Sequence, residues 1–314
     1  MSRLEELLNS AGSVAISGHI RPDGDCVGSV MAVCRYIKKN MPQIAVGVFL
    51  EEPSSVFKCI QGIEAIDSNM DTLHEYDVFI ALDCNSERLG RALEIFERAK
   101  TKINIDHHVS NTGCGDINII VPDASSTCEV VYELMDTGKI DEEIAKTLYI
   151  GMIHDTGVFK YSNTSPKTLR IAAELIAYGF DFTKIIDETF YEKTYEQTLV
   201  CGKAVSESVR FMDGKCIFSV VDKEMMELYG VGPKDLDGVI NQLRIVKGVE
   251  CAIFMYQTGH MEYKVSMRSN GVVNVSSIAS FFGGGGHVKA AGCTMRGTVH
   301  DVINNLSAQI ALQM

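Results

Sequence analysis

Short apolar runs alternate with helix-patterned stretches along the first half of the chain. Four runs rich in Val and Ile, each bounded by polar residues, lie at 13–20, 44–50, 77–83 and 102–108. Such runs are typical of strands that are buried on both faces of a parallel sheet. Segments with helical periodicity lie at 27–39, 86–99, 126–136, 141–153 and 166–178. The alternation predicts a doubly wound α/β domain with a mainly parallel sheet over residues 1–190.

The pattern changes after Phe190. Residues 191–209 are polar and compatible with a helix, so we expect a helical linker there. Strand-like runs follow at 215–222, 249–257 and 261–269, and helix-like segments follow at 233–243, 274–281 and 299–311. These segments predict a second, smaller α/β domain over residues 210–314.

Composition limits the class of protein. The 314 residues are 46% hydrophobic, which is enough to build a core. No apolar run approaches the length of about 18 residues that a membrane span needs, and the charged N-terminus does not resemble a signal peptide. The 10 cysteines are irregularly spaced without a CxxC pair, which disfavours a disulfide framework and a thiolate zinc site. We therefore expect a cytoplasmic protein that does not bind membranes.

The net charge of −12 limits the ligands. Proteins that bind long nucleic acid displace counterions with a basic stripe, and this chain has no block of Lys and Arg. Long duplex nucleic acid is therefore disfavoured as a ligand, and we expect none among the partners. A short anionic ligand, held by metal ions and a few cationic side chains, remains compatible with the charge.

Potential metal ligands follow the first predicted strand. His19, Asp23 and Asp25 stand within seven residues, and Pro22 and Gly24 allow the chain to turn sharply between them. Parallel sheets bind ligands beyond the carboxyl ends of their strands, where these side chains are expected. The alternative for Asp25 is a structural one, in which its carboxylate caps the helix that follows.

Further ligand candidates close other elements of the first domain. Asp83 ends the third predicted strand, and Asp106, His107 and His108 end the fourth. Asp155 closes a helical run. Each could be an ordinary turn or helix-stop residue, but the carboxyl ends of parallel strands meet at one edge of a sheet. The coincidence favours a metal site at that edge.

The type of ligand indicates the chemistry. Carboxylate and imidazole groups without thiolate suit Mn²⁺ or Mg²⁺, with Zn²⁺, Fe²⁺ or Co²⁺ also possible, and we expect Mn²⁺ first. Two such ions about 3.5–4 Å apart can clamp the attacking and leaving oxygens of a displacement at phosphorus. A carboxylate shared between the ions would hold that spacing. The site therefore predicts a phosphoesterase that uses two divalent metal ions.

A second signal lies near the C-terminal end of the chain. Four consecutive glycines, 283–286, precede His287 and Lys289. Glycines expose backbone N–H groups and permit the close approach of a phosphate, whereas the structural alternative is a flexible turn. In combination with a metal site, the run indicates that the second domain holds the substrate.

These motifs resemble the signature blocks of a known family. The segments HIRPDGD, ALDCN, IDHH followed by VSN, and HDTG followed by YSN resemble, in order and spacing, the DHH phosphoesterases. The segment GGGGHVKAAG resembles the glycine-rich block of the associated DHHA1 domain. The resemblance extends from residue 19 to residue 292, and the size is most similar to the stand-alone NrnA-type nanoRNase and pAp-phosphatase branch.

The resemblance implies a role for each candidate. One metal ion would be held by His19, Asp23 and Asp83. The other would be held by Asp25, Asp83, His107 and Asp155, with Asp83 bridging. His108 would face the scissile phosphate, supported by Asp106. Substrate contacts would come from Arg268, Gly284, Gly285, Gly286 and His287.

The resemblance also implies the reaction: hydrolysis of short single-stranded RNA or DNA oligonucleotides, and removal of the 3′-phosphate from pAp. Two alternatives within the class are a cyclic-dinucleotide or pApA phosphodiesterase and a RecJ-like single-strand exonuclease. Family II pyrophosphatases share the N-terminal blocks, but the glycine-rich block argues against them. A nucleotide-binding regulatory module is the alternative outside enzymes, and a homodimer is left open.

Overall fold

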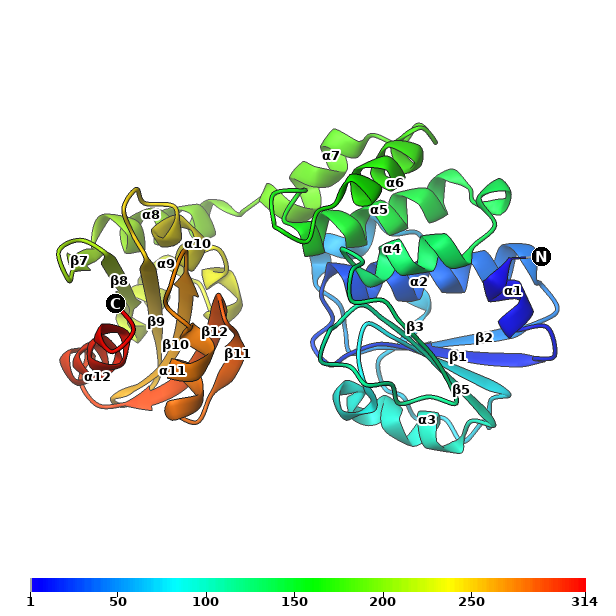
Figure 1. Cartoon of the computed structure of the whole chain (residues 1–314), viewed down its shortest axis with the longest axis horizontal. Coiled ribbons are helices and arrows are strands. Elements are labelled where there is room, and N and C mark those ends of the chain that lie inside the picture. The colour runs from blue at the N-terminus through cyan, green and yellow to red at the C-terminus, as the bar shows by residue number, and fades with distance from the viewer. Residues whose placement is uncertain (1) are drawn as a thin grey trace. The chain divides into compact units, whose positions relative to one another are not determined.

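The computed structural model describes residues 2–314 and divides into two compact units, Met1–Glu192 and Lys193–Met314 (Figure 1). Each unit is built on a six-stranded sheet of its own. The first sheet is wholly parallel and the second is mixed, which confirms the predicted fold class. Among the described residues, no helix is long and apolar enough to cross a bilayer.

The first sheet has the order β3-β2-β1-β4-β5-β6. Its two central strands, β1 and β4, are buried along their whole length, as their uninterrupted apolar sequences predict. The sequence did not reveal β3, which has only two residues, or β6, which is partly exposed. The strands are β1 Ser13–Ser17, β2 Ala45–Phe49, β3 Ile66–Asp67, β4 Val78–Leu82, β5 Thr101–Asp106 and β6 Ile117–Ile120.

Helices cover both faces of this sheet (Figure 1). Alternate residues of β1 divide between two cores: Val14 and Ile16 pack with α2, α4 and α5, whereas Ala15 packs with α3. This is the arrangement of a doubly wound fold. The helices are α1 Arg3–Leu7, α2 Gly24–Asn40, α3 Leu93–Arg98, α4 Thr127–Leu134, α5 Glu142–Thr156, α6 Pro166–Ile176 and α7 Phe182–Ile186.

The predicted helix at 86–99 is wrong in its first half. Two 3₁₀ turns, Ser86–Arg88 and Gly90–Ala92, precede the short helix α3. Gly90 has a φ of +55°, which is left-handed backbone that a continuous right-handed helix excludes.

Helices α2 and α5 approach closely because glycines face each other between them. A Cβ atom on Gly28 would lie 3.0 Å from the backbone N of Gly151 and 3.0 Å from the carbonyl oxygen of Thr147. A Cβ atom on Gly151 would overlap the Sγ atom of Cys128 and lie 3.0 Å from a carboxylate oxygen of Asp25. The close packing therefore brings α2, α4 and α5 together at the point where Asp25 lies.

The second unit has the sheet order β11-β12-β10-β9-β8-β7. One face packs on α8 and α10 and the other on α11 and α12. The strands are β7 Val209–Phe211, β8 Cys216–Val221, β9 Cys251–Gly259, β10 Glu262–Ser269, β11 Gly285–His287 and β12 Ala290–Arg296. The helices are α8 Tyr195–Ser206, α9 Lys223–Tyr229, α10 Val239–Arg244, α11 Val275–Phe281 and α12 Val299–Ala311.

The glycine run differs from the loop expected from the sequence. Its second half forms the edge strand β11, in which Gly285 pairs with Gly292 and His287 pairs with Ala290. Gly284 and Gly286 are required by packing, because a Cβ atom on either would clash with the backbone of β12. Gly285 has no such requirement, since a Cβ atom there would meet nothing within 4 Å.

Replacing Gly28 with Ala is expected to lower the free energy of unfolding of the first unit by about 1–3 kcal/mol, because the added methyl group meets backbone atoms that cannot rotate away. Urea unfolding measures the change. Gly202→Ala in α8 is the matched control, because its Cβ atom meets nothing within 4 Å and the change is expected to stabilise the helix. Equal stability of Gly28→Ala and the wild-type protein would contradict the close packing of α2 and α5.

Candidate metal and phosphoester site

The site forms where the strand order of the first sheet reverses. The chain moves outward from β1 to β2 and β3 on one side, and from β4 to β5 and β6 on the other. The loops that follow β1 and β4 therefore diverge and leave a crevice between them. Doubly wound folds bind ligands in such a crevice, at the carboxyl ends of the strands. His19 follows β1, Asp83 directly follows β4, and Asp106 is the last residue of β5.

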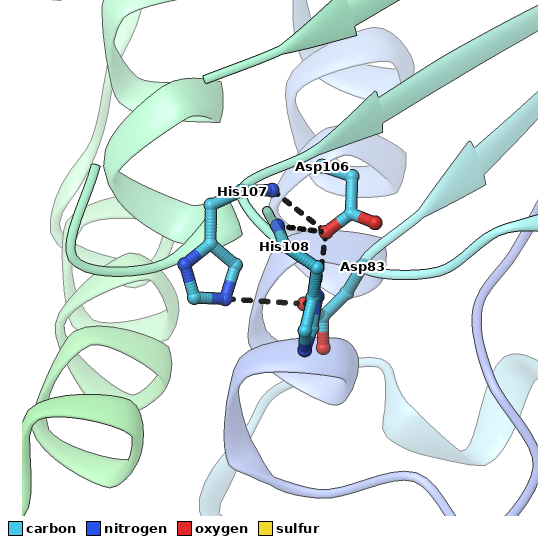
Figure 2. A group of neighbouring side chains, drawn as sticks. All are labelled: Asp83, Asp106, His107 and His108. Atoms are coloured by element: carbon cyan, nitrogen blue, oxygen red, sulfur yellow. Dashed lines mark hydrogen bonds and ion pairs between the residues drawn. The ribbon is translucent and has the colours of Figure 1, made fainter. Parts of the chain in front are cut away.

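Asp83 lies at the centre of the group. It is 2% exposed, its φ is +60°, and its backbone N–H donates to the carbonyl oxygen of Ile105 at 3.0 Å. Its Oδ2 atom lies 3.4 Å from Nε2 of His19. Its Oδ1 atom lies 3.7 Å from Nε2 of His107 and 3.6 Å from Nδ1 of His108 (Figure 2). The two oxygens of one carboxylate thus face two different groups of side chains.

The first group contains His19 and Asp23. Nε2 of His19 lies 3.6 Å from Oδ1 of Asp23, and Nδ1 of His19 lies 2.9 Å from the carbonyl oxygen of Ile20, which fixes the ring. Asp23 is the N-cap of α2: its carboxylate accepts the backbone N–H groups of Asp25 and Cys26. The helix therefore begins at Gly24, three residues before the predicted start, and Asp25 is not its cap.

The second group contains Asp25, His107 and Asp155. Nε2 of His107 lies 3.4 Å from Oδ2 of Asp155 and 3.9 Å from Oδ2 of Asp25. The carboxylate of Asp25 accepts the backbone N–H groups of Thr127 at 2.6 Å and Cys128 at 2.9 Å, in the first turn of α4. Asp25 is therefore oriented by a helix N-terminus, where a negative charge is stabilised.

Asp106 plays a different part from the other carboxylates (Figure 2). Its Oδ1 atom accepts the backbone N–H groups of His107 and His108 at 2.7 and 3.1 Å, and it lies 2.7 Å from Nδ1 of His108. Its Oδ2 atom accepts the side-chain amide of Asn111 at 2.6 Å. Burial opposes ionisation, but His108 and Asn111 hold the pKa of Asp106 below its usual value. The acid therefore fixes the adjacent histidines.

Several residues of the site were missed in the sequence. Asn104 donates to the carbonyl oxygens of Ala81 and Cys84, on both sides of Asp83, and accepts from Asn111. A polar Asn inside an otherwise apolar strand could have revealed it. Other missed residues are Thr127 and Cys128, whose signal is the capping pattern Ser-Thr-Cys-Glu at 126–129, and Asn163, which donates to the carbonyl oxygens of Ser125 and Asp155.

Cys26 also belongs to the surroundings of the first group. Its Sγ atom lies with ligand atoms of His19 and Asp83 inside one potential metal cluster. Burial, followed by the charges of Asp83 and Asp23, raises the pKa of the Cys26 thiol well above its usual value. The thiol is therefore a less suitable ligand than the carboxylates beside it. No signal in the sequence distinguishes it from the other cysteines.

The candidate substrate residues of the second unit share one face of its sheet. His287 of β11 pairs with Ala290 of β12, which pairs in turn with Arg268 of β10. Directly paired residues point to the same side, so the side chains of Arg268 and His287 flank a small alanine. Gly285 lies on this face as well, because it precedes His287 by two positions. The glycines and His287 are exposed, and Arg268 is half-buried.

Comparison with known proteins decides the family. The DHH family N-terminal domain matches residues 13–152, and the DHHA1 domain matches residues 213–312. Over 303 residues the chain is 31% identical to the bifunctional oligoribonuclease and PAP phosphatase NrnA of Thermus thermophilus, a match that covers 95% of this chain and 89% of that protein. The chain belongs to the DHH family.

Solved structures of similar fold support this placement. An exopolyphosphatase-related protein from Bacteroides fragilis superposes with a TM-score of 0.89 at 25% identity, over 99% of this chain and 96% of that one. RecJ of Thermus thermophilus in complex with Mn²⁺ gives a TM-score of 0.56 at 14% identity, over 98% of this chain and 53% of that one. The likeness to RecJ concerns the fold alone.

The residues of this DHH site fit divalent metal ions. Three groups of side chains bring ligand atoms within 4.8 Å of one another, and Asp83 belongs to two of these groups. Within residues 2–314, the buried Nε2 atom of His107 makes no hydrogen bond, although carboxylate oxygens lie 3.4–3.9 Å away. A cation between them would satisfy the nitrogen and neutralise the oxygens together. Oxygen and imidazole donors of this kind suit Mn²⁺ and Mg²⁺.

Electrostatics indicates the same need for positive charge. Burial, reinforced by the charges of Asp83 and Asp155, raises the pKa of Asp25 well above its usual value. Burial and the charges of Asp83 and Asp23 raise the pKa of Asp155 to about 7. Burial alone would lower the pKa of His19, but Asp23 and Asp83 raise it to about 10. Protons on these groups balance part of the negative charge, and divalent cations would compete with them.

The stabilising effect of Mn²⁺ is expected to depend on pH. The raised pKa values of Asp25 and Asp155 mean that the metal-free folded protein keeps protons that the unfolded chain releases above about pH 4, so its stability falls as the pH rises towards about 7. Metal ligands must be deprotonated, so the rise in Tm that Mn²⁺ produces should be larger at about pH 8 than at about pH 5. Thermal unfolding with and without Mn²⁺ measures it.

The control for this pH dependence is Asp155→Asn, which removes one titrating carboxyl group. Its Mn²⁺-induced rise in Tm should be smaller at both values of pH. A rise of equal size at both values in the wild-type protein would contradict the coupling between protons and metal.

Proposed function

We propose that the chain is a metal-dependent phosphoesterase that hydrolyses short oligoribonucleotides and removes the 3′-phosphate from pAp. The observation that carries the proposal is the position of Asp83, whose two carboxylate oxygens face two separate groups of ligands. A shared carboxylate is what a pair of metal ions acting on one phosphate requires. The relative from Thermus thermophilus is named as a bifunctional oligoribonuclease and PAP phosphatase, which supports the substrate class.

Two ions would occupy the two groups, with Mn²⁺ as the first candidate and Mg²⁺ or Co²⁺ as alternatives. His19, Asp23 and Asp83 would hold one ion. Asp25, Asp83, His107 and Asp155 would hold the other. When bound, the ions would supply Lewis-acid stabilisation of the phosphate oxygens and a water of lowered pKa.

His108 is the candidate proton donor. Its Nδ1 atom is held by Asp106, so Nε2 is the ring nitrogen that remains for the substrate. The hydrogen bond to Asp106 is the main cause that raises the pKa of His108 above its usual value, with burial opposing it. A protonated ring can stabilise charge on a phosphate oxygen or give a proton to the leaving oxygen. Asp106 positions this ring without touching the substrate.

The second unit supplies the candidate grip on the substrate. Arg268 and His287 flank Ala290 on the polar face of the sheet, and Arg268 can hold a phosphate with two parallel hydrogen bonds. Gly285 has open space where a side chain would be, so a phosphate can approach the strand closely there. Residues 210–314 are accordingly the candidate substrate-binding domain and residues 1–190 the catalytic one.

Replacing Asp83 with Ala is expected to reduce hydrolysis of pAp and of pApA by at least about a thousandfold, because the group shared by both ligand sets is lost. The measurement is product release with Mn²⁺, compared with protein treated with a chelator. Asp71→Ala is the matched control, because Asp71 is 78% exposed and pairs with the surface residue Arg91. Full activity of Asp83→Ala, or of the chelator-treated protein, would contradict the two-metal proposal.

Replacing Arg268 with Ala is expected to raise KM for short RNA by about 10- to 100-fold while kcat changes by less than about threefold, because a charged hydrogen bond to the ground state is lost. Arg296→Ala is the matched control on the same sheet face, where Arg296 pairs with Glu262.

A comparison of kcat/KM ranks the candidate substrates. The panel contains pAp, pApA, cyclic-di-AMP, RNA from dinucleotides to 24-mers, and pyrophosphate. A preference for the longest RNA would contradict the short-substrate proposal. A loss in kcat alone for Arg268→Ala would indicate that Arg268 acts in the chemical step and not in substrate binding.

A further inference from the structure

Thr127 touches two buried carboxylates, that of Asp25 in the second ligand group and that of Asp83, which both groups share. Its backbone N–H donates to Oδ2 of Asp25 at 2.6 Å, and its hydroxyl donates to Oδ1 of Asp83 at 3.0 Å. Thr127 is itself fully buried and is the first residue of α4. Thr127, which is held by α4, therefore links the carboxylate of Asp25 in α2 to the carboxylate of Asp83 after β4.

The backbone around Asp83 is already fixed by other contacts. The Asp83 N–H bonds to β5, and Asn104 binds the carbonyl oxygens of Ala81 and Cys84 on each side. The freedom that remains is rotation of the carboxylate about its side-chain bonds. The hydroxyl of Thr127 restricts this rotation, because it selects Oδ1 and leaves Oδ2 facing His19 at 3.4 Å.

We propose that Thr127 is a positioning residue that sets how the Asp83 carboxylate is shared between the two metal positions. This inference rests on the proposed function, since it assumes that Asp83 bridges two ions. A carboxylate oxygen that accepts one hydrogen bond retains a second lone pair for a cation. The hydroxyl thus orients Oδ1 without occupying it, in the way that groups behind metal ligands commonly act.

The arrangement also explains why the position carries a residue with a hydroxyl rather than a purely apolar one. The surroundings are fully buried, and Val has nearly the same shape as Thr. With Val, Oδ1 of Asp83 would lose a hydrogen bond in a site that water barely reaches, and its carboxylate could turn away from His107. The backbone contact to Asp25 would persist in any variant, which separates the role of the hydroxyl from that of the helix.

The experiment compares Thr127→Val, Thr127→Ala and Thr127→Ser with the full-length wild-type protein. Isothermal titration with Mn²⁺ gives stoichiometry and affinity, and EPR spectroscopy reports the magnetic coupling within an Mn²⁺ pair. Removing the hydroxyl is expected to weaken Mn²⁺ binding by about 10- to 100-fold and to change the coupling signal. Thr127→Ser restores the hydroxyl and should lie within about threefold of wild type.

The matched control is Thr147→Val. Thr147 is 2% exposed in α5, and its hydroxyl donates only to the carbonyl oxygen of Glu143 in its own helix, so the same chemical change should leave Mn²⁺ binding unaltered. Circular dichroism shows which Thr127 variants fold, and Thr127→Ala is the second variant without a hydroxyl if Thr127→Val does not fold.

The outcomes separate this inference from the proposed function. Unchanged affinity and unchanged coupling in Thr127→Val or Thr127→Ala would overturn the role of the hydroxyl. Equal loss in Thr127→Ser would overturn it too, because packing rather than hydrogen bonding would then be responsible. If the wild-type protein binds Mn²⁺ pairs but hydrolyses none of the phosphate esters, the proposed function fails while the comparison of Thr127 variants remains valid.

Discussion

The first unit depends on crowding carboxylates around Asp83 in a place that water barely reaches. Asp25 and Asp83 are each 2% exposed, and the charges of Asp83 and Asp155 both disfavour a negative charge on Asp25. Two like charges about 4 Å apart repel each other by about 4 kcal/mol at an effective dielectric constant of 20. The fold therefore has to bring positive potential to the same point. The histidines, the N–H groups of α4 and protons on the acids supply part of it, and divalent cations are the remaining source.

The architecture around the site is consistent with that requirement. Strand reversal between β1 and β4 opens the crevice, and the glycines at 28 and 151 let α2 and α5 close on it. α4 points its N-terminus at Asp25, where a glutamate or aspartate is stabilised by the helix dipole. Asn104 and Asn111 connect the backbone at Asp83 to Asp106, so the two strand ends hold their side chains in one hydrogen-bonded frame.

The sequence predicts part of this arrangement because parallel strands end at one edge. The strand runs before His19, Asp83 and Asp106 are apolar and short, so their order and the position of these side chains follow from local pattern and one topological rule. The hydrogen-bond partners of Asp25 cannot be predicted from local pattern, because Thr127 and Cys128 are more than 100 residues away in the sequence. Strand β11 was missed for a different reason: glycine is disfavoured in strands, and only the pairing with β12 makes this run extended.

The two units differ in the charge of their candidate functional residues, and this difference is relevant to the length of the substrate. The first buries carboxylates and needs added cations. The second carries Arg268, Lys264 and His287 on one face of its sheet, beside Ala290 and Gly292, within a chain whose net charge is −12. Long nucleic acid gains affinity by releasing counterions along many phosphates, which requires an extended basic surface. Under the proposed function, the second unit offers few phosphate contacts, and these match ligands of few nucleotides better than long strands.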